Sequence, residues 1–145
     1  GSMSPTGFIG PNRSVSTPRR AIVSTGTPVY WSMMAAKQLR EKYGIRARVI
    51  DMHTVKPMDT DMLLKCARET GNVFTVEEHS INGGLGGAVA EFLLEAGFSG
   101  RFKRIGLPDE FAVLGDPDEV YEYYGLDPFG IAEKISAALK APRLL

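Results

Sequence analysis

Cysteine is almost absent from this sequence, since Cys66 is the only one in 145 residues. A single thiol excludes an internal disulfide framework and any metal site built from several thiolates of one chain. The sequence also has no apolar run of the roughly 20 residues that a membrane-spanning helix needs, and its N-terminus lacks the basic-then-apolar order of a signal peptide. We therefore expect a protein of a reducing, cytoplasmic compartment.

An excess of charge of either sign is missing as well. The 17 Lys and Arg residues balance the 17 Asp and Glu residues, so no global field attracts nucleic acid, anionic lipid or an acidic partner. Histidine is scarce, and a metal site would have to combine His53 or His79 with carboxylates from separate loops, so we predict no metal site. No Gly-x-Ser-x-Gly elbow is present, which leaves a serine hydrolase without support.

The length of 145 residues suits one domain with a single hydrophobic core. Residues 1–18 are rich in glycine, proline, serine and threonine and offer few apolar side chains, so we predict a flexible arm. Its first residues, Gly1-Ser2-Met3, resemble a protease-cleavage scar. A start in such a stretch suggests a chain cut from a longer one, or one that begins at an interdomain linker. We predict the folded domain over residues 19–145.

Short apolar runs alternate with segments of helical periodicity along this domain. Strands are predicted near 21–25, 46–52, 73–76 and 102–107, and a helix of about 10 to 16 residues follows each of the first three. Shorter helices are predicted at 120–124 and 131–140. Strands that alternate with helices imply crossover connections, hence a mainly parallel sheet with helices on both faces. The predicted fold class is therefore α/β, a three-layer doubly wound sandwich.

The first predicted helix has one apolar face. Val29, Met33, Ala36, Leu39 and Tyr43 recur at helical spacing and form the predicted buried stripe. Glycines at 44, 71 and 97 are predicted to end the three crossover helices.

The carboxyl ends of the strands are where such sheets bind ligands, and the most informative of these ends is the segment 77–87. Two carboxylates and an imidazole there could perform acid–base chemistry. The same groups could instead bond to backbone amides of the following turn and to a neighbouring domain or subunit. We favour this second interpretation, which assigns no catalytic, cofactor-binding or metal-binding residue and defines a candidate interface or loop site at Glu77, Glu78, His79, Gly83, Gly84 and Gly86.

The glycines of this segment could also let backbone amides approach a phosphate at a helix N-terminus. The spacing is not a dinucleotide fingerprint, because Val89 stands at the third glycine position. It is not a P-loop either, because no Lys-Ser or Lys-Thr pair follows. Close packing of helix on sheet explains the glycines more simply.

Six motifs follow one another between about residue 21 and residue 140. They are Ile22-Val23-Ser24-Thr25-Gly26, Ala47-Arg48-Val49-Ile50-Asp51-Met52, Lys56-Pro57-Met58-Asp59, Val76-Glu77-Glu78-His79-Ser80 with Gly83-Gly84-Leu85-Gly86, Arg104-Ile105-Gly106-Leu107-Pro108-Asp109, and Tyr124-Gly125-Leu126-Asp127-Pro128 with Gly130-Ile131. In this order they resemble the C-terminal domain of transketolases, which deoxyxylulose-phosphate synthase and the beta subunits of 2-oxoacid dehydrogenases share. The Glu-Glu-His spelling at 77–79 resembles transketolase more than the other two.

The resemblance implies a five-stranded sheet, mostly parallel with one antiparallel strand. In that family, thiamine diphosphate and magnesium are held between two other domains, one with a Gly-Asp-Gly motif and a downstream Asn, the other with a glutamate that activates the aminopyrimidine. This sequence has no Gly-Asp-Gly. The resemblance therefore implies that the chain binds no cofactor by itself, and that thiamine diphosphate and magnesium belong to the assembled enzyme.

The implied function is that of a C-terminal domain or split subunit of a transketolase, which transfers a two-carbon ketol unit between sugar phosphates. Its implied partners are the thiamine-binding domains or subunit of the same enzyme, in an assembly that is a homodimer; the chain alone would be inactive. Two alternatives stay open. One is the equivalent domain of deoxyxylulose-phosphate synthase or of a 2-oxoacid dehydrogenase beta subunit, and the other is a stand-alone nucleotide- or anion-binding module at residues 83–87.

Deleting residues 1–18 should leave folding intact, because this arm offers few apolar groups for a core. We expect the thermal midpoint, measured by circular dichroism, to fall by less than about 4 °C, the shift that a loss of roughly 1 kcal/mol causes in a domain near this size. A larger fall would mean that the arm packs on the domain and that the boundary at residue 18 is wrong.

Overall fold

The computed structural model describes residues 19–52, 58–80, 84–108 and 116–142. The predicted arm, His53 and Gly83 lie outside them. Within the described residues the chain forms four strands and five helices: β1 (Ala21–Ser24), α1 (Thr27–Tyr43), β2 (Arg48–Asp51), α2 (Thr60–Thr70), β3 (Asn72–Ser80), α3 (Leu85–Glu95), β4 (Arg101–Leu107), α4 (Pro117–Tyr123) and α5 (Pro128–Lys140).

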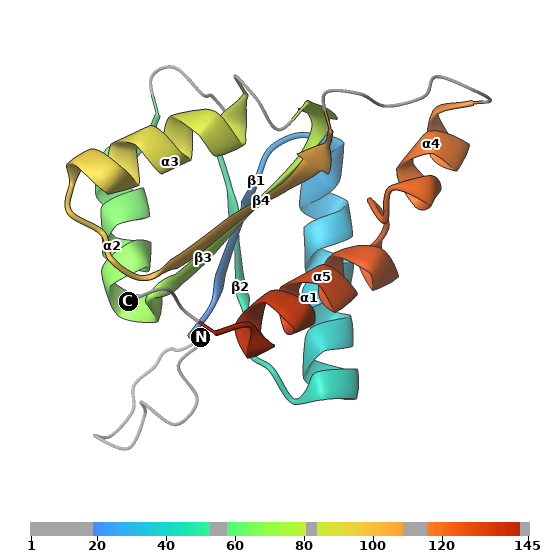
Figure 1. Ribbon diagram of the computed structural model, residues 1–145, viewed down its shortest axis with the longest axis horizontal. Coiled ribbons are helices and arrows are strands. Elements are labelled where there is room, and N and C mark those ends of the chain that lie inside the picture. The colour runs from blue at the N-terminus through green and yellow to red at the C-terminus, as the bar shows by residue number, and fades with distance from the viewer. Residues whose placement is uncertain (1–18, 53–57, 81–83, 109–115, 143–145) are drawn as a thin grey trace.

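The four strands form one parallel sheet in the order β2-β1-β3-β4 (Figure 1). Each of the first three strands is followed by a crossover helix, as the alternating pattern predicted, and the α/β class is confirmed. The antiparallel fifth strand that the resemblance implied is not found among the described residues. Because all four strands run the same way, their carboxyl ends share one edge, from which α1, α2 and α3 begin.

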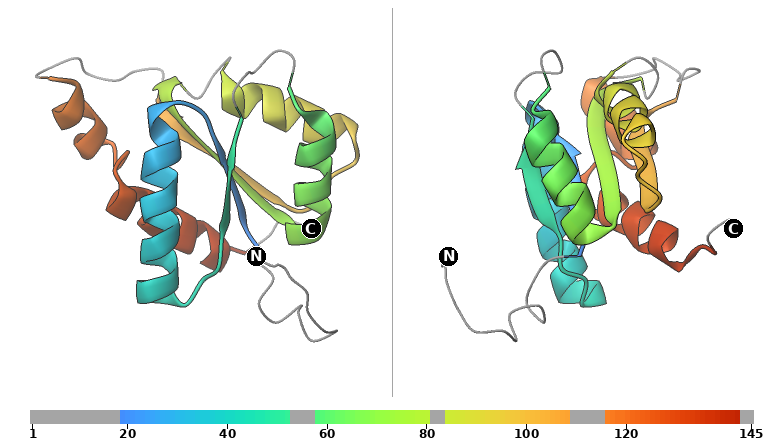
Figure 2. Two further views of the ribbon diagram at one scale, coloured as in Figure 1. Left: turned by 180° about the vertical axis from the view of Figure 1, so that it is seen from behind. Right: turned by 90° about the vertical axis from the view of Figure 1, so that its left-hand side faces the viewer.

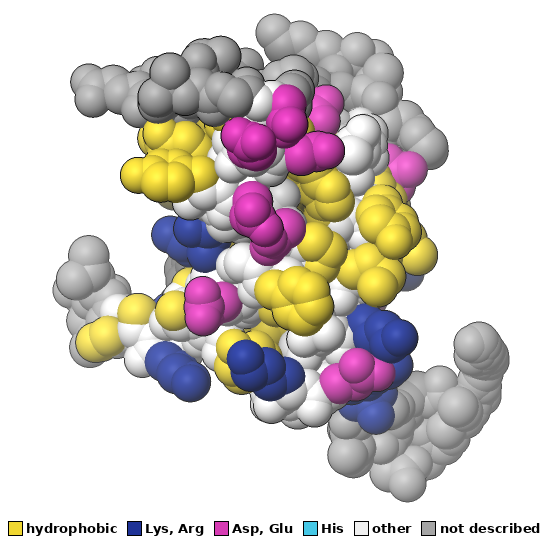
Figure 3. All heavy atoms as spheres, turned by 90° about the vertical axis from the view of Figure 1, so that its right-hand side faces the viewer, with side chains coloured by type: hydrophobic (Ala, Val, Ile, Leu, Met, Phe, Trp, Pro, Cys, Tyr) yellow, Lys and Arg dark blue, Asp and Glu magenta, His cyan; other side chains and the backbone are white. Residues whose placement is uncertain are grey.

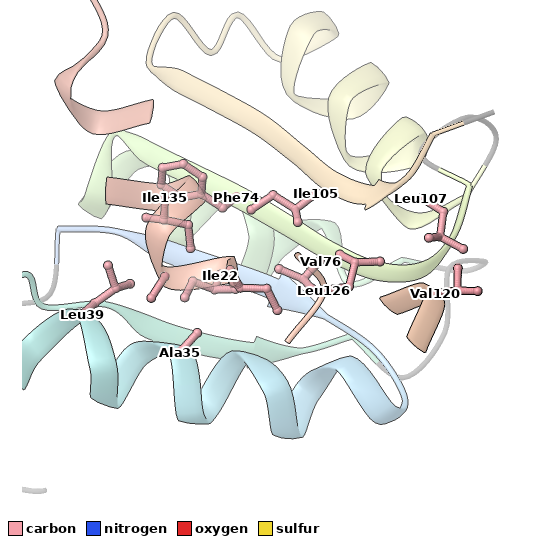
Figure 4. Close-up of a cluster of buried hydrophobic side chains, with 12 residues drawn as sticks. Ile22, Ala35, Leu39, Phe74, Val76, Ile105, Leu107, Val120, Leu126 and Ile135 are labelled. Atoms are coloured by element: carbon pink, nitrogen blue, oxygen red, sulfur yellow. The ribbon is translucent and has the colours of Figure 1, made fainter. Parts of the chain in front are cut away.

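Helices cover both faces of the sheet and make it a three-layer structure (Figure 2). The pair α1 and α5 packs on one face, around Phe74 and Leu39, and Figure 4 shows side chains from β1, β3, β4 and these helices meeting there. The pair α2 and α3 packs on the other face, around Val73 and Leu63. Alternate residues of β1 and β3 thus enter opposite cores, as expected of a strand buried on both sides.

The predicted buried stripe of α1 is confirmed in part, since Leu39 is buried and Ala36 and Tyr43 pack against the core, but it is wrong at Met33. The residues that are buried are Pro28, Ser32, Ala35 and Leu39, whereas Met33 is 58% exposed. The helix lies against both the sheet and α5, and such close approach selects small side chains such as Ser32 and Ala35. A search for large apolar residues at helical spacing misses this face.

Helix ends follow the sequence signals more closely. Gly44 and Gly71 end α1 and α2 in the left-handed conformation, with φ of 66° and 68°, where residues other than glycine are disfavoured. The Asp59 side chain accepts a hydrogen bond from the Met62 amide at the start of α2, at 3.1 Å. These local choices fix where each crossover helix starts and stops, and so how the strands line up.

Candidate functional site

Strand β3 changes register against β4 within the segment that the sequence singled out. Val76 pairs with Ile105 and Ser80 with Leu107, so β3 advances four residues while β4 advances two. Glu77, Glu78 and His79 therefore lie in an irregular stretch of a strand, and not beyond its end as predicted. Such bulges bend a strand and redirect its side chains.

The Glu77 carboxylate joins β3 to the first turn of α3. Its Oε1 accepts a hydrogen bond from the Leu85 amide at 3.0 Å, and its Oε2 accepts one from the Gly86 amide at 2.8 Å. The side chain is 4% exposed. The N-cap residue of α3 is Gly84, which has no side chain to cap the helix. Glu77 replaces that missing cap, and its negative charge lies where the helix dipole favours an anion.

Gly86 allows this contact because it lacks a side chain. A Cβ atom at this position would lie 2.8 Å from Glu77 Oε2, 2.9 Å from Arg104 Cγ and 2.9 Å from Thr75 Oγ1. Thr75 is itself fully buried, so these atoms have little room to move. The predicted role of the glycines, close packing of helix on sheet, thus has a definite geometry at Gly86.

The same geometry weakens the anion-binding alternative. A phosphate at the N-terminus of α3 would need backbone amides as donors. The amides of Leu85 and Gly86 already donate to the Glu77 carboxylate. The chain thus supplies its own anion at the place where a bound phosphate would compete for the same donors.

Glu78 acts on the opposite side of β3, toward α4. Burial, together with the negative charges of Glu78 and Asp118, raises the pKa of Tyr121 above its usual value. The Tyr121 phenol therefore loses its proton only at a higher pH than an ordinary tyrosine does. Its ring packs edge-on against Trp31 of α1, with centroids 5.1 Å apart and planes at 63°. The irregular stretch of β3 thus contacts α3 through Glu77 and influences α4 through Glu78.

Of the six predicted site residues, Glu77, Gly84 and Gly86 come together at the start of α3. Glu78 lies apart from them, near Tyr121. The backbone of His79 belongs to β3, and Gly83 is outside the described residues. Sequence reasoning did not assign Thr75, Arg104 or Tyr121 to the site, although Arg104 begins one of the six motifs. All three reach the site from regular elements.

The described residues show neither a metal cluster nor a membrane span. No group of three or more His, Cys, Asp or Glu residues within them could hold a metal ion. Their one buried carboxylate at the strand ends, that of Glu77, is taken up by two backbone amides. No helix among these residues is long and apolar enough to cross a membrane.

A parallel, doubly wound sheet with a carboxylate-capped helix at its carboxyl edge defines an α/β domain. The family model for "Transketolase, C-terminal domain" matches residues 12–131. The chain belongs to the transketolase C-terminal domain family. The match begins inside the predicted arm, and the boundary at residue 18 stays a prediction.

Curated relatives include separate subunits as well as long enzymes. The chain is 47% identical to a subunit of apulose-4-phosphate transketolase from Phocaeicola vulgatus, over 77% of this chain and 35% of that protein. It is 42% identical to a putative transketolase C-terminal section of Methanocaldococcus jannaschii, over 82% of this chain and 36% of that protein. It is also 43% identical to 1-deoxy-D-xylulose-5-phosphate synthase 1 of Geobacter sulfurreducens, over 83% of this chain and 19% of that protein.

Solved structures give the same picture. A split-gene transketolase described as an inactive beta4 tetramer superimposes with a TM-score of 0.77 at 39% identity, covering 88% of this chain and 41% of that one. A transketolase from Pichia stipitis shares the fold, with a TM-score of 0.57 at 22% identity, covering 85% of this chain and 16% of that one. The chain thus spans less than half of each protein compared. Its identities to transketolases and to the synthase are similar. They therefore do not support the preference for transketolase over the synthase that the Glu-Glu-His spelling suggested.

Gly86→Ala should destabilise the chain, whereas Gly87→Ala should not. A methyl group at residue 86 meets three packed atoms, and such overpacking costs about 1 to 3 kcal/mol. At residue 87, in the same turn, no atom lies within 4 Å of the added Cβ, and replacing a helical glycine with alanine stabilises by about 0.4 to 1 kcal/mol. Denaturant unfolding of both variants measures this difference in sign. Equal stability of the two would exclude a packing role for Gly86.

Proposed function

We propose that this chain is the C-terminal, non-cofactor-binding domain or split subunit of a transketolase-type enzyme. In the assembled enzyme it supports dimerisation and packs against the thiamine-binding domains, which carry out two-carbon ketol transfer between sugar phosphates. The observation that carries this proposal is the match to relatives whose names describe a C-terminal section and a separate transketolase subunit. Thiamine diphosphate and magnesium are held by the partner domains, and the chain alone is inactive.

The surface of α1, α4 and α5 supports a role in packing. Of the five exposed large hydrophobic side chains among the described residues, four belong to these helices: Tyr30, Met33, Tyr123 and Phe129. Figure 3 shows hydrophobic side chains in patches on this face, with acidic side chains gathered at its upper end. Exposed apolar patches rimmed by polar residues are typical of protein–protein contacts.

The surroundings of the thiol suit a reducing, cytoplasmic compartment. Cys66 is free and buried within α2, where it acts as a small apolar core residue.

A domain of deoxyxylulose-phosphate synthase is the second candidate function, favoured by 43% identity to such an enzyme. The acceptor substrate of the assembled enzyme distinguishes the two.

The chain alone should not bind thiamine diphosphate in the presence of magnesium. Isothermal titration calorimetry should detect no heat of binding, because the residues that hold the cofactor are supplied by the partner. A micromolar affinity, which needs about 8 kcal/mol of organised contacts, would contradict the proposal. The matched measurement adds a protein that carries the two thiamine-binding domains, and cofactor binding and ketol transfer should then appear together.

His79→Ala should lower the turnover of this assembled enzyme by less than about tenfold, because removal of a true general acid or base costs on the order of 10² to 10⁴. His53→Ala is the matched control, since these are the 2 histidines of the chain. Steady-state turnover and complex formation are measured for both variants. A hundredfold loss in His79→Ala alone, with unchanged assembly, would place His79 in the active site.

A further inference from the structure

Strand β4 is the outer strand of the sheet on one side. Among the described residues it pairs with β3 alone, and no strand lies beyond it. In Figure 1 it crosses the front of the molecule, with α5 below it. One row of its backbone N–H and C=O groups therefore faces away from the sheet. Such an edge is a template for another extended segment.

A groove of about 610 Å³ follows this edge, between β4 and the second half of α5. Its size is in the range of small ligand sites. The wall of the groove on the side of α5 carries mainly the small side chains of Ala137, Ala138 and Ala141. Small side chains there leave room for the side chains of an added strand.

The charge of the groove has one sign. Arg101, Lys103, Arg104 and Lys134 line it, and no Asp or Glu of the described residues does. Arg101 is fixed in place, since its Nη1 donates to the carbonyl oxygens of Ala138 at 2.6 Å and Ala141 at 3.2 Å. This contact ties the end of α5 to the first residue of β4. The exposed Lys103 projects from the middle of the strand.

Lysine and arginine on an edge strand usually prevent pairing with other chains. Here they also choose which chains can pair. A basic or neutral strand would be repelled or left without compensating charge, whereas an acidic strand would gain attraction along the whole groove. Main-chain bonding supplies the pairing, and charge supplies the selection.

We propose that the outer edge of β4 binds an extended acidic segment of a partner polypeptide, which adds a strand to the sheet beside β4. The main chain of the segment bonds to β4, and its carboxylates face Lys103 and Lys134. This binding mode needs neither a cofactor nor the surface of α1, α4 and α5. It can therefore hold or fail independently of the transketolase role.

The probe is a synthetic peptide of alternating valine and glutamate, as long as the 7 residues of β4. Two control peptides have the same length: one replaces glutamate with lysine, and the other keeps glutamate but carries N-methyl groups along one edge. Binding to the full chain is followed by amide NMR shifts. We expect the acidic peptide to bind and to shift the amides of β4, the lysine peptide not to bind, and the N-methylated peptide to bind at least about tenfold more weakly.

Lys103→Glu tests the charge, and Lys65→Glu on α2 is the matched control, because both lysines are exposed. We expect Lys103→Glu to weaken peptide binding by about tenfold or more and Lys65→Glu to change it by less than about twofold. Added salt should weaken binding to the unaltered chain, because it screens exposed charges. No binding of the acidic peptide, or equal binding of the N-methylated or lysine peptide, would overturn the proposal. Equal effects of the two lysine variants would overturn it as well.

Discussion

The contact between the Glu77 carboxylate and the first two amides of α3 holds the carboxyl edge of this sheet together. Helix α3 begins at a glycine that cannot cap it, so its amides need an acceptor from elsewhere. The acceptor comes from the irregular part of β3, and the approach is possible only because residue 86 has no side chain. Carboxylate, bulge and glycine depend on one another. The charge-assisted bonds involved contribute on the order of 1.5 to 3 kcal/mol each, a large share of the stability of a small domain.

This arrangement also explains how residues 77–87, whose sequence suggests a catalytic or phosphate-binding site, include a carboxylate with a structural role. A buried carboxylate beside a glycine-rich turn suggests acid–base catalysis or phosphate binding. Here the carboxylate uses both oxygens on backbone donors and also takes the place of a phosphate. The outward-facing features lie elsewhere: hydrophobic side chains on α1, α4 and α5, and a basic groove along β4. A net charge of zero could not reveal that basic side chains line the groove along β4.

The alternation of apolar runs with helical periods predicted the layers, the four parallel strands and the helix-ending glycines, because these depend on local sequence. It also predicted that polar groups at 77–79 would bond to amides of the turn that follows, and this prediction is confirmed for Glu77. The sequence pattern did not predict features that depend on contacts between residues far apart in the sequence. Ser32 faces the core because α1 packs closely on its neighbours, and the strand continues through Glu77 because β4 pairs with Ser80. Thr75, Arg104 and Tyr121 join the site from regular elements, which no spacing rule marks.

The mutual dependence of Glu77 and α3 has a consequence for how this part of the fold opens. The first turn of a helix normally frays, and its amides exchange rapidly with solvent. Here the amides of Leu85 and Gly86 are buried and bonded to a neighbouring strand. Fraying of α3 would leave the Glu77 carboxylate desolvated and without donors, so α3 cannot loosen alone. The strand and the helix therefore form one cooperative unit that opens as a whole.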